Sequence, residues 1–172
     1  MRVVRVGAAG TAAELAGLFR SVPMVLSSKA QGLVRDVPCK PMIVIATPGF
    51  EPRVRPVSNE RGAAGHEYRA VAILDAWTSL YALGVDARLD TLTAWMRAVS
   101  LCAPRSRGGQ ALILGETDPA IAQSLMMWDS RILASKDLDE RMETGMPPTV
   151  AAACVWGRRD AAVSYTHLRA HE

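Results

Sequence analysis

The stretch at residues 69–77, Arg-Ala-Val-Ala-Ile-Leu-Asp-Ala-Trp, is the feature that most constrains the fold of this chain. It is a short apolar run between polar segments, and it is apolar at successive positions instead of alternating with polar residues. Such a run is typical of a fully buried strand in a parallel sheet with helices on either side. The sequence therefore predicts an α/β domain with a parallel central sheet, and it places Leu74 in the core.

Asp75 closes this strand, at the end where ligands of open α/β sheets bind. Two interpretations are open: the carboxylate contacts a ligand, or it caps the turn that follows. The capping interpretation is favoured, because aspartate commonly accepts hydrogen bonds from nearby backbone N–H groups in turns.

Other apolar runs alternate with helical patterns along the chain, as expected for a parallel sheet. The predicted strands lie at residues 2–6, 24–26, 41–47 and 110–115, and a further strand is predicted to begin at residues 149–156. The predicted helices are one beginning near Thr11, one at residues 86–101, one after Asp118 and one at residues 131–144.

Local signals support these helices. Thr11 and Glu14 have the spacing of a capping box, with Leu15, Leu18 and Phe19 as the buried stripe, and Asp118-Pro119 is a strong helix start. Ile121, Leu125 and Trp128 then share one helix face. The helix at residues 86–101 has Leu89, Leu92, Trp95, Met96 and Val99 on one face, which predicts a core position for Trp95. Asp137, Asp139, Glu140 and Glu143 alternate with Lys136 and Arg141, which predicts an exposed, salt-bridged face.

Several classes of function lack their residue patterns. The chain has no phosphate-binding loop of the Gly-x-x-x-x-Gly-Lys-Ser/Thr type, no Gly-x-Ser-x-Gly elbow and no Cys-x-x-Cys pair, and His66 is the single histidine before residue 163. It also has no run of about 18 apolar residues and no signal-peptide core. We therefore expect a cytoplasmic domain with no metal site, no complete active site and no membrane partner.

Residues 48–67 are rich in Pro, Gly, Arg and Glu and predict a long loop. It carries Arg53, Arg55 and Arg61, and a second basic turn carries Arg105 and Arg107. A solvated loop is the favoured interpretation because glutamates lie among the arginines. If the arginines face one crevice, however, they form a patch on which a DNA backbone can lie.

Residues 163–172, Val-Ser-Tyr-Thr-His-Leu-Arg-Ala-His-Glu, resemble the conceptual translation of a sequencing adapter. We therefore expect this tail to be non-native, and we do not treat His167 and His171 as metal ligands.

Four segments together resemble the PriA family of replication restart proteins, also called primosomal protein N prime. They are residues 5–15 around Gly-Ala-Ala-Gly-Thr, residues 43–47 Ile-Val-Ile-Ala-Thr, residues 71–75 Val-Ala-Ile-Leu-Asp, and residues 138–148, Leu-Asp-Glu-Arg followed by Gly-Met-Pro-Pro. The resemblance implies a RecA-like second helicase lobe at residues 1–130 and the start of the C-terminal domain at residues 131–162. By the same resemblance, Thr47, Gly49 and Asp75 are candidate nucleotide-binding residues.

The chain departs from the family at the motifs that carry activity. Active members have Gly-Thr-Gln and a Lys-Gly pair where this chain has Ala-Thr-Pro-Gly at residues 46–49, and Pro104 interrupts the region of the arginine finger. The pattern resembles the high-GC bacterial branch of the family, which lacks helicase activity. The family's zinc cysteines would precede Met1, and its ATP is bound to a first lobe that is not present here. ATP and zinc are therefore cofactors only by resemblance, and no cofactor is expected in this fragment.

The favoured hypothesis is a degenerate helicase lobe that binds single-stranded or forked DNA and other primosome proteins without unwinding. Two alternatives remain open. One is the second lobe of an active ATP-dependent helicase, and the other is a protein-docking lobe without DNA contact.

Overall fold

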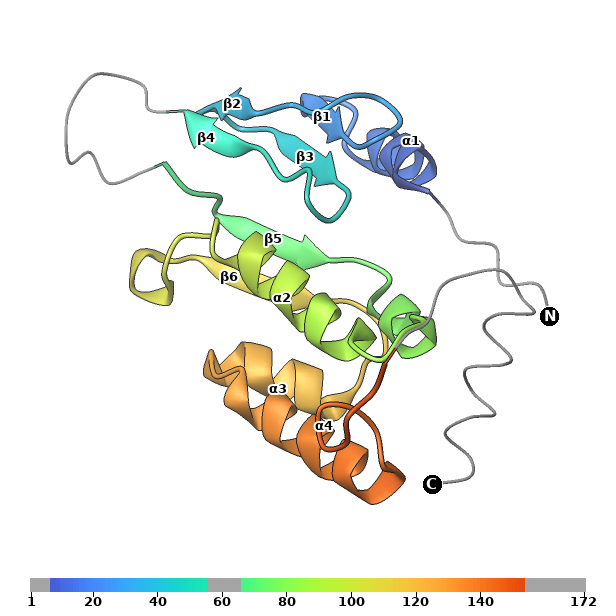
Figure 1. The fold of residues 1–172 in the computed structure, drawn as a ribbon. Helices are drawn as coiled ribbons and strands as arrows, with labels where there is room; N and C mark the ends of the chain where they lie inside the picture. Colours follow the sequence, from blue (N-terminus) through green and yellow to red (C-terminus); the bar gives the residue numbers. More distant parts are fainter. Residues whose placement is uncertain (1–6, 56–65, 154–172) are drawn as a thin grey trace, which may run out of the picture. The chain divides into compact units, whose positions relative to one another are not determined.

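The computed structural model describes residues 7–55 and 66–153, which form two compact units divided between Ser130 and Arg131. The predicted strand at residues 2–6, Arg61 and the tail at residues 163–172 lie outside the described residues. The first unit contains α1 (Ala8–Leu18), β1 (Met24–Ser27), β2 (Asp36–Pro38), β3 (Ile43–Ala46), β4 (Arg53–Arg55), β5 (Ala70–Ile73), the 3-10 helix η1 (Ala76–Tyr81), α2 (Ala87–Val99), the 3-10 helix η2 (Arg105–Arg107), β6 (Gln110–Ile113) and α3 (Pro119–Met127) (Figure 1). The second unit contains α4 (Arg131–Thr144).

The strands of the first unit pair in parallel, which confirms a mixed α/β fold with parallel pairing. The described strands form three two-stranded sheets, β1–β3, β2–β4 and β5–β6, instead of one central sheet. Strand β4 was missed in the sequence, where residues 48–67 were predicted to be a loop. It forms because Val54 lies between two arginines in an alternating pattern, and it pairs in register with β2.

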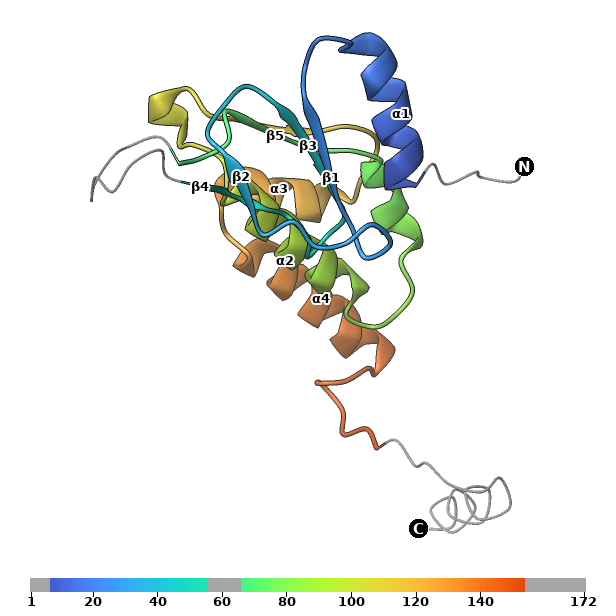
Figure 2. The same cartoon turned by 90° about the horizontal axis from the view of Figure 1, so that it is seen from above.

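The core of the first unit lies mainly on α2 and α3, which pack against each other (Figure 2). Leu92 and Trp95 of α2 and Ile121 and Leu125 of α3 are all buried. Their spacing of three or four residues places each pair on one helix face, as the apolar periodicity predicted. Helix α2 also contacts β5, so this helix links the core to the β5–β6 sheet.

The prediction that residues 69–77 form a fully buried central strand is wrong. Alternate residues of β5 are exposed, Leu74 is 43% exposed, and β5 pairs with β6 alone among the described strands. An apolar run indicates which side chains tolerate burial, but it does not say what covers them. In this chain α2 contacts β5, while Leu74, Leu112 and Leu114 remain exposed.

Helix α1 begins earlier than predicted. Gly7 occupies the N-cap position, and its carbonyl accepts hydrogen bonds from the backbone N–H groups of Gly10 and Thr11. The capping-box prediction is therefore wrong, because Thr11 lies inside the first turn. No residue of α1 is buried, and Leu18 and Phe19 are 77% and 46% exposed, so the predicted buried stripe is also wrong.

Helix α3 begins as predicted. The Asp118 carboxylate accepts a hydrogen bond from the Ala120 N–H at 2.7 Å, and Pro119 takes the first helical position. At the other end, Trp128 adopts a left-handed conformation with φ of 54° and is 52% exposed. Trp128 therefore does not continue the buried face of Ile121 and Leu125, because the helix ends at this residue.

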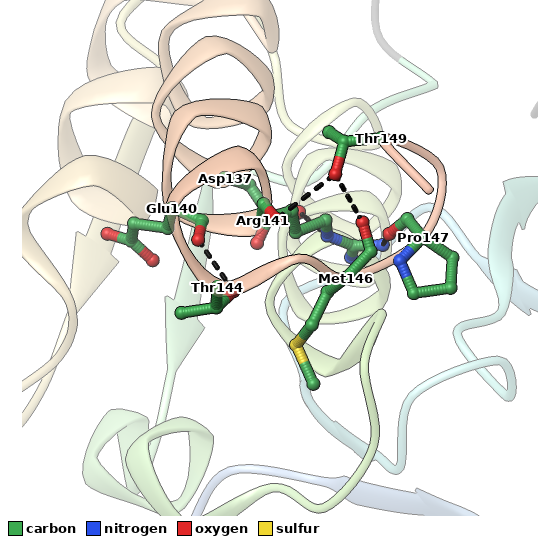
Figure 3. A network of polar contacts seen from close by, with 7 residues as sticks. All are labelled: Asp137, Glu140, Arg141, Thr144, Met146, Pro147 and Thr149. Atoms are coloured by element: carbon green, nitrogen blue, oxygen red, sulfur yellow. Dashed lines mark hydrogen bonds and ion pairs between the residues drawn. The ribbon is translucent and has the colours of Figure 1, made fainter. Parts of the chain in front are cut away.

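In the second unit, a buried ion pair on α4 is the centre of a network of polar contacts (Figure 3). The Arg141 Nε lies 2.6 Å from the Asp137 Oδ2, and both residues are buried. Arg141 Nη1 donates to the Pro147 carbonyl, and the Thr149 hydroxyl donates to the Arg141 carbonyl. The predicted exposed face is therefore wrong for Asp137 and Arg141.

The remainder of α4 follows the prediction more closely. Lys136 and Glu140 form an exposed ion pair at 3.9 Å, and Gly145 ends the helix with φ of +62°. The described part of the predicted strand at residues 149–156, residues 149–153, contains no strand. None of the helices in the described ranges is long and apolar enough to cross a membrane.

Candidate nucleic-acid interface

The turn after β3 contains Thr47 and Gly49, the first two candidate nucleotide-binding residues. The Phe50 N–H donates to the Thr47 carbonyl, and Gly49 has φ of +92°, a conformation that glycine adopts without strain. The Gly49 N–H donates to both carboxylate oxygens of Glu51, at 2.9 and 3.1 Å. Arg97 on α2 holds the same carboxylate, with its Nε 3.5 Å from Oε2. The backbone donor that could meet a phosphate is thus occupied by the chain's own Glu51.

Asp75, the third candidate, lies at the start of η1 in a left-handed conformation with φ of 51°. Asp75 occupies the N-cap position of η1, as the capping interpretation expects. Its side chain makes no capping hydrogen bond, however, so that part of the interpretation is wrong. The structure brings the ends of β5 and β6 together here, since the Ala76 N–H donates to the Leu114 carbonyl and Ser79 bonds Thr117. Among the described residues, no hydrogen bond or ion pair joins Asp75 to Thr47 or Gly49.

Arg53 and Arg55 lie on one exposed face of β4, because residues two apart in a strand point the same way. The side chain of Arg55 is 71% exposed, and its Nη2 is 3.9 Å from the Asp36 carboxylate, a loose ion pair. Val54 points to the opposite side and lines a cavity of about 780 Å³. The two arginines therefore project away from that cavity.

Arg105 and Arg107 lie in the η2 loop and line a larger cavity of about 930 Å³. Its lining also includes Ser100, Gly109, Leu112 and Trp128. Gly109 allows the loop to fold tightly, because a Cβ at this position would lie 1.7 Å from the Ala103 carbonyl oxygen. The described candidate arginines thus fall into two groups, one on β4 and one around this cavity.

Two residues around the η2 loop were not predicted as site residues from the sequence. Arg69 donates from Nη1 to the Arg107 carbonyl at 2.9 Å, and Trp128 lines the larger cavity. Arg69 was assigned to a buried strand, and Trp128 to a helix face with Ile121 and Leu125. The signal that could have found Trp128 is the turn Trp-Asp-Ser at residues 128–130, which separates two helical patterns.

Charges around the η2 loop are partly compensated. Arg107 forms an ion pair with Glu67, while Arg105 is exposed and makes no ion pair among the residues of known placement. Tyr68, beside Glu67, donates its hydroxyl to the Pro52 carbonyl at 2.8 Å, and burial raises its pKa to about 12. At neutral pH Tyr68 is therefore a neutral hydrogen-bond donor.

Groups of three or more His, Cys, Asp or Glu side chains that could hold a metal ion are absent from residues 7–55 and 66–153. Cys102 is a free thiol in this part of the chain.

Comparison with known proteins identifies similar chains in mycobacteria. The chain is 37% identical over 161 residues, 94% of its length, to the "Probable replication restart protein PriA" of Mycobacterium leprae. It is 36% identical over 157 residues to the proteins of the same name from Mycobacterium tuberculosis and Mycobacterium bovis. The matched region covers 22 to 23% of these curated relatives. No family model and no solved structure matches the chain.

Proposed function

We propose that this chain is a RecA-like lobe which binds DNA without unwinding it. The premise is that the chain is homologous to a segment of PriA-type replication restart proteins. In this proposal residues 1–130 are the helicase-type lobe and residues 131–162 begin a C-terminal domain. Its partners are single-stranded or forked DNA and other proteins of the replication restart machinery.

One observation carries the DNA-binding part of the proposal: Arg53 and Arg55 project together from an exposed face of β4. Guanidinium groups bind phosphates in any base sequence, because the phosphate backbone is the same throughout. The loose contact of Arg55 with Asp36 leaves its charge available in water, where an exposed ion pair of this kind contributes little stability.

The absence of unwinding is supported by the turn after β3. A lobe that takes part in ATP hydrolysis must present donors to phosphate oxygens. Here the Gly49 N–H is occupied by the Glu51 carboxylate, and a second negative charge next to that carboxylate is disfavoured. We expect Mg-ATP to give no heat of binding with this chain in calorimetry.

The test is a salt titration of binding to a fluorescent single-stranded oligonucleotide, measured by anisotropy with the full 172-residue chain. The double variant R53A/R55A should bind unrelated sequences equally weakly. It should also reduce the slope of log affinity against log salt by about 1.4, since each lost phosphate contact on a single strand changes the slope by about 0.7. The matched control R20A/K29A also removes two exposed charges and should leave the slope unchanged.

Two results would count against the proposal. If R53A/R55A behaves as the control does, β4 is not a DNA-binding surface. If the wild-type chain binds no oligonucleotide at low salt, the DNA-binding role is wrong as a whole.

A protein-docking lobe is the second candidate, and one feature favours it. The segment around the end of η1 exposes large apolar side chains in succession, with Tyr81 73% and Leu83 98% exposed. Apolar side chains so placed are typical of interaction surfaces. Binding of a restart partner that depends on Leu83, together with no DNA binding, would favour this candidate.

A further inference from the structure

The larger cavity combines an exposed aromatic ring with basic side chains. Trp128 lines it from the C-terminal end of α3, and Arg105 and Arg107 line it from the η2 loop. Its volume of about 930 Å³ is at the upper end of the range for small-molecule pockets, roughly 300 to 1,000 Å³. The cavity is therefore large enough for a flat heterocycle together with the groups attached to it.

Trp128 is an unusual residue for its position. A helix that ends in the left-handed conformation normally has glycine there, because a side chain makes this conformation costly. Trp128 is also 52% exposed, so burial of its ring does not offset the strain. A strained, exposed tryptophan beside a cavity is the kind of outlier from which a binding function can be inferred.

The charge around the cavity is positive. Arg69, Arg105 and Arg107 meet at the η2 loop, and Glu67 is the acidic residue in the lining. Glu67 is paired with Arg107. Gly108 brings the backbone close to Arg69, whose Nη1 would lie 3.5 Å from a Cβ at that position. A ligand of this surface must therefore carry negative charge as well as an aromatic face.

We infer that this cavity binds single-stranded DNA, with an unstacked base on the ring of Trp128 and the neighbouring phosphates on Arg105 and Arg107. This inference rests on the proposed function and narrows its ligand from single-stranded or forked DNA to a single strand with an unstacked base. In a duplex the faces of the bases are covered by their neighbours, so a ring at the protein surface has no base face to stack on. Stacking on an aromatic side chain is also tolerant of base sequence, because every base has a flat face.

The experiment compares an oligothymidylate with an oligonucleotide of the same length that carries abasic sites, using the full chain and anisotropy. The wild-type chain should bind the abasic strand more weakly by about 5- to 150-fold, which corresponds to the loss of one base–aromatic stack. W128A should bind oligothymidylate more weakly by a similar factor and should no longer distinguish the two strands. W128F should recover most of the affinity, and F19A, which removes an exposed aromatic ring that does not line the cavity, should have no effect.

Salt dependence separates the two contacts. W128A should leave the salt slope unchanged, because it removes no phosphate contact, whereas R105A should reduce it by about 0.7. Wild-type binding that is equal for the two strands, or unaffected by W128A, would overturn this inference while leaving the proposed DNA binding intact. Failure of the wild-type chain to bind either strand would overturn both. The comparison of the two strands needs no variant, so it holds even if W128A proves unstable.

Discussion

At the scale of single residues, the Tyr68 hydroxyl ties residues 66–69 to the segment that precedes β4. It donates to the Pro52 carbonyl, and Pro52 is among the most deeply buried residues. Burial raises the Tyr68 pKa from 10.0 to about 12. In the unfolded chain the same group ionises near pH 10, so between pH 10 and 12 the unfolded state binds fewer protons than the folded state.

This difference gives a prediction for Tyr68→Phe. Below pH 10 the variant should be less stable by about 1 kcal/mol, because the Pro52 carbonyl loses its donor. From pH 10 to 12 the wild-type chain loses this advantage, since the raised folded-state pKa stabilises the fold only while Tyr68 is protonated. Urea unfolding at several pH values should show the gap between the two chains closing over this range. A gap that stays constant would mean that Tyr68 titrates normally in the folded state.

At the scale of helices and strands, the start of α3 depends on Asp118. Its carboxylate caps the Ala120 N–H, and its Oδ2 lies 3.1 Å from Arg88 on α2. Asp118→Ala should cost about 1 to 2 kcal/mol through loss of the cap. Asp118→Asn keeps a cap acceptor and should cost less, as judged by urea unfolding. Equal losses in the two variants would assign the effect to the ion pair with Arg88.

Helix α4 depends on a buried ion pair. Asp137→Ala should destabilise it by about 3 kcal/mol, because Arg141 remains buried without the carboxylate. The double variant D137L/R141M removes both charges and should recover most of this loss. Lys136→Ala, at the exposed pair with Glu140, is the control and should change stability by less than about 0.5 kcal/mol.

Hydrogen exchange of the backbone amides in residues 131–144 measures these effects within α4. Faster exchange in D137A, restored in D137L/R141M, is the expected result. If the double variant exchanges as fast as D137A, the hydrogen bond from the Arg141 guanidinium to the Pro147 carbonyl is what stabilises α4, and the charge balance is secondary.

At the scale of the whole molecule, the core includes α2 and does not include Leu74 of the apolar run at residues 69–77. Leu92 on α2 is 2% exposed and Leu74 after β5 is 43% exposed. Leu92→Ala should therefore cost about 2 to 5 kcal/mol through the cavity that it leaves, and Leu74→Ala should cost about 1 kcal/mol or less. Chemical unfolding of the two variants tests this order. A larger loss for Leu74→Ala would restore the apolar run at residues 69–77 to the centre of the core.

The sequence by itself determined the helices whose ends carry their own signals. Asp118-Pro119 at the start of α3 and Gly145 at the end of α4 act through atoms a few residues away, so local chemistry is enough to predict them. Parallel pairing was predicted from the alternation of strands and helices and is confirmed, although β1 to β4 follow one another without an intervening helix. The resemblance to PriA proteins, seen in the order and spacing of four segments, is confirmed by the similarity to the mycobacterial proteins of that name.

The tertiary structure alone decided what covers each apolar run and which charges meet. Leu74 and Trp128 have large apolar side chains of the kind that fill protein cores, yet both are about half exposed. Burial of such a side chain depends on segments that are distant in the sequence. The same is true of Arg69 and Arg107, which lie 38 residues apart and meet at the η2 loop. Short-range signals cannot encode such meetings, because they arise only when the pairing of β5 with β6 brings the two loops together.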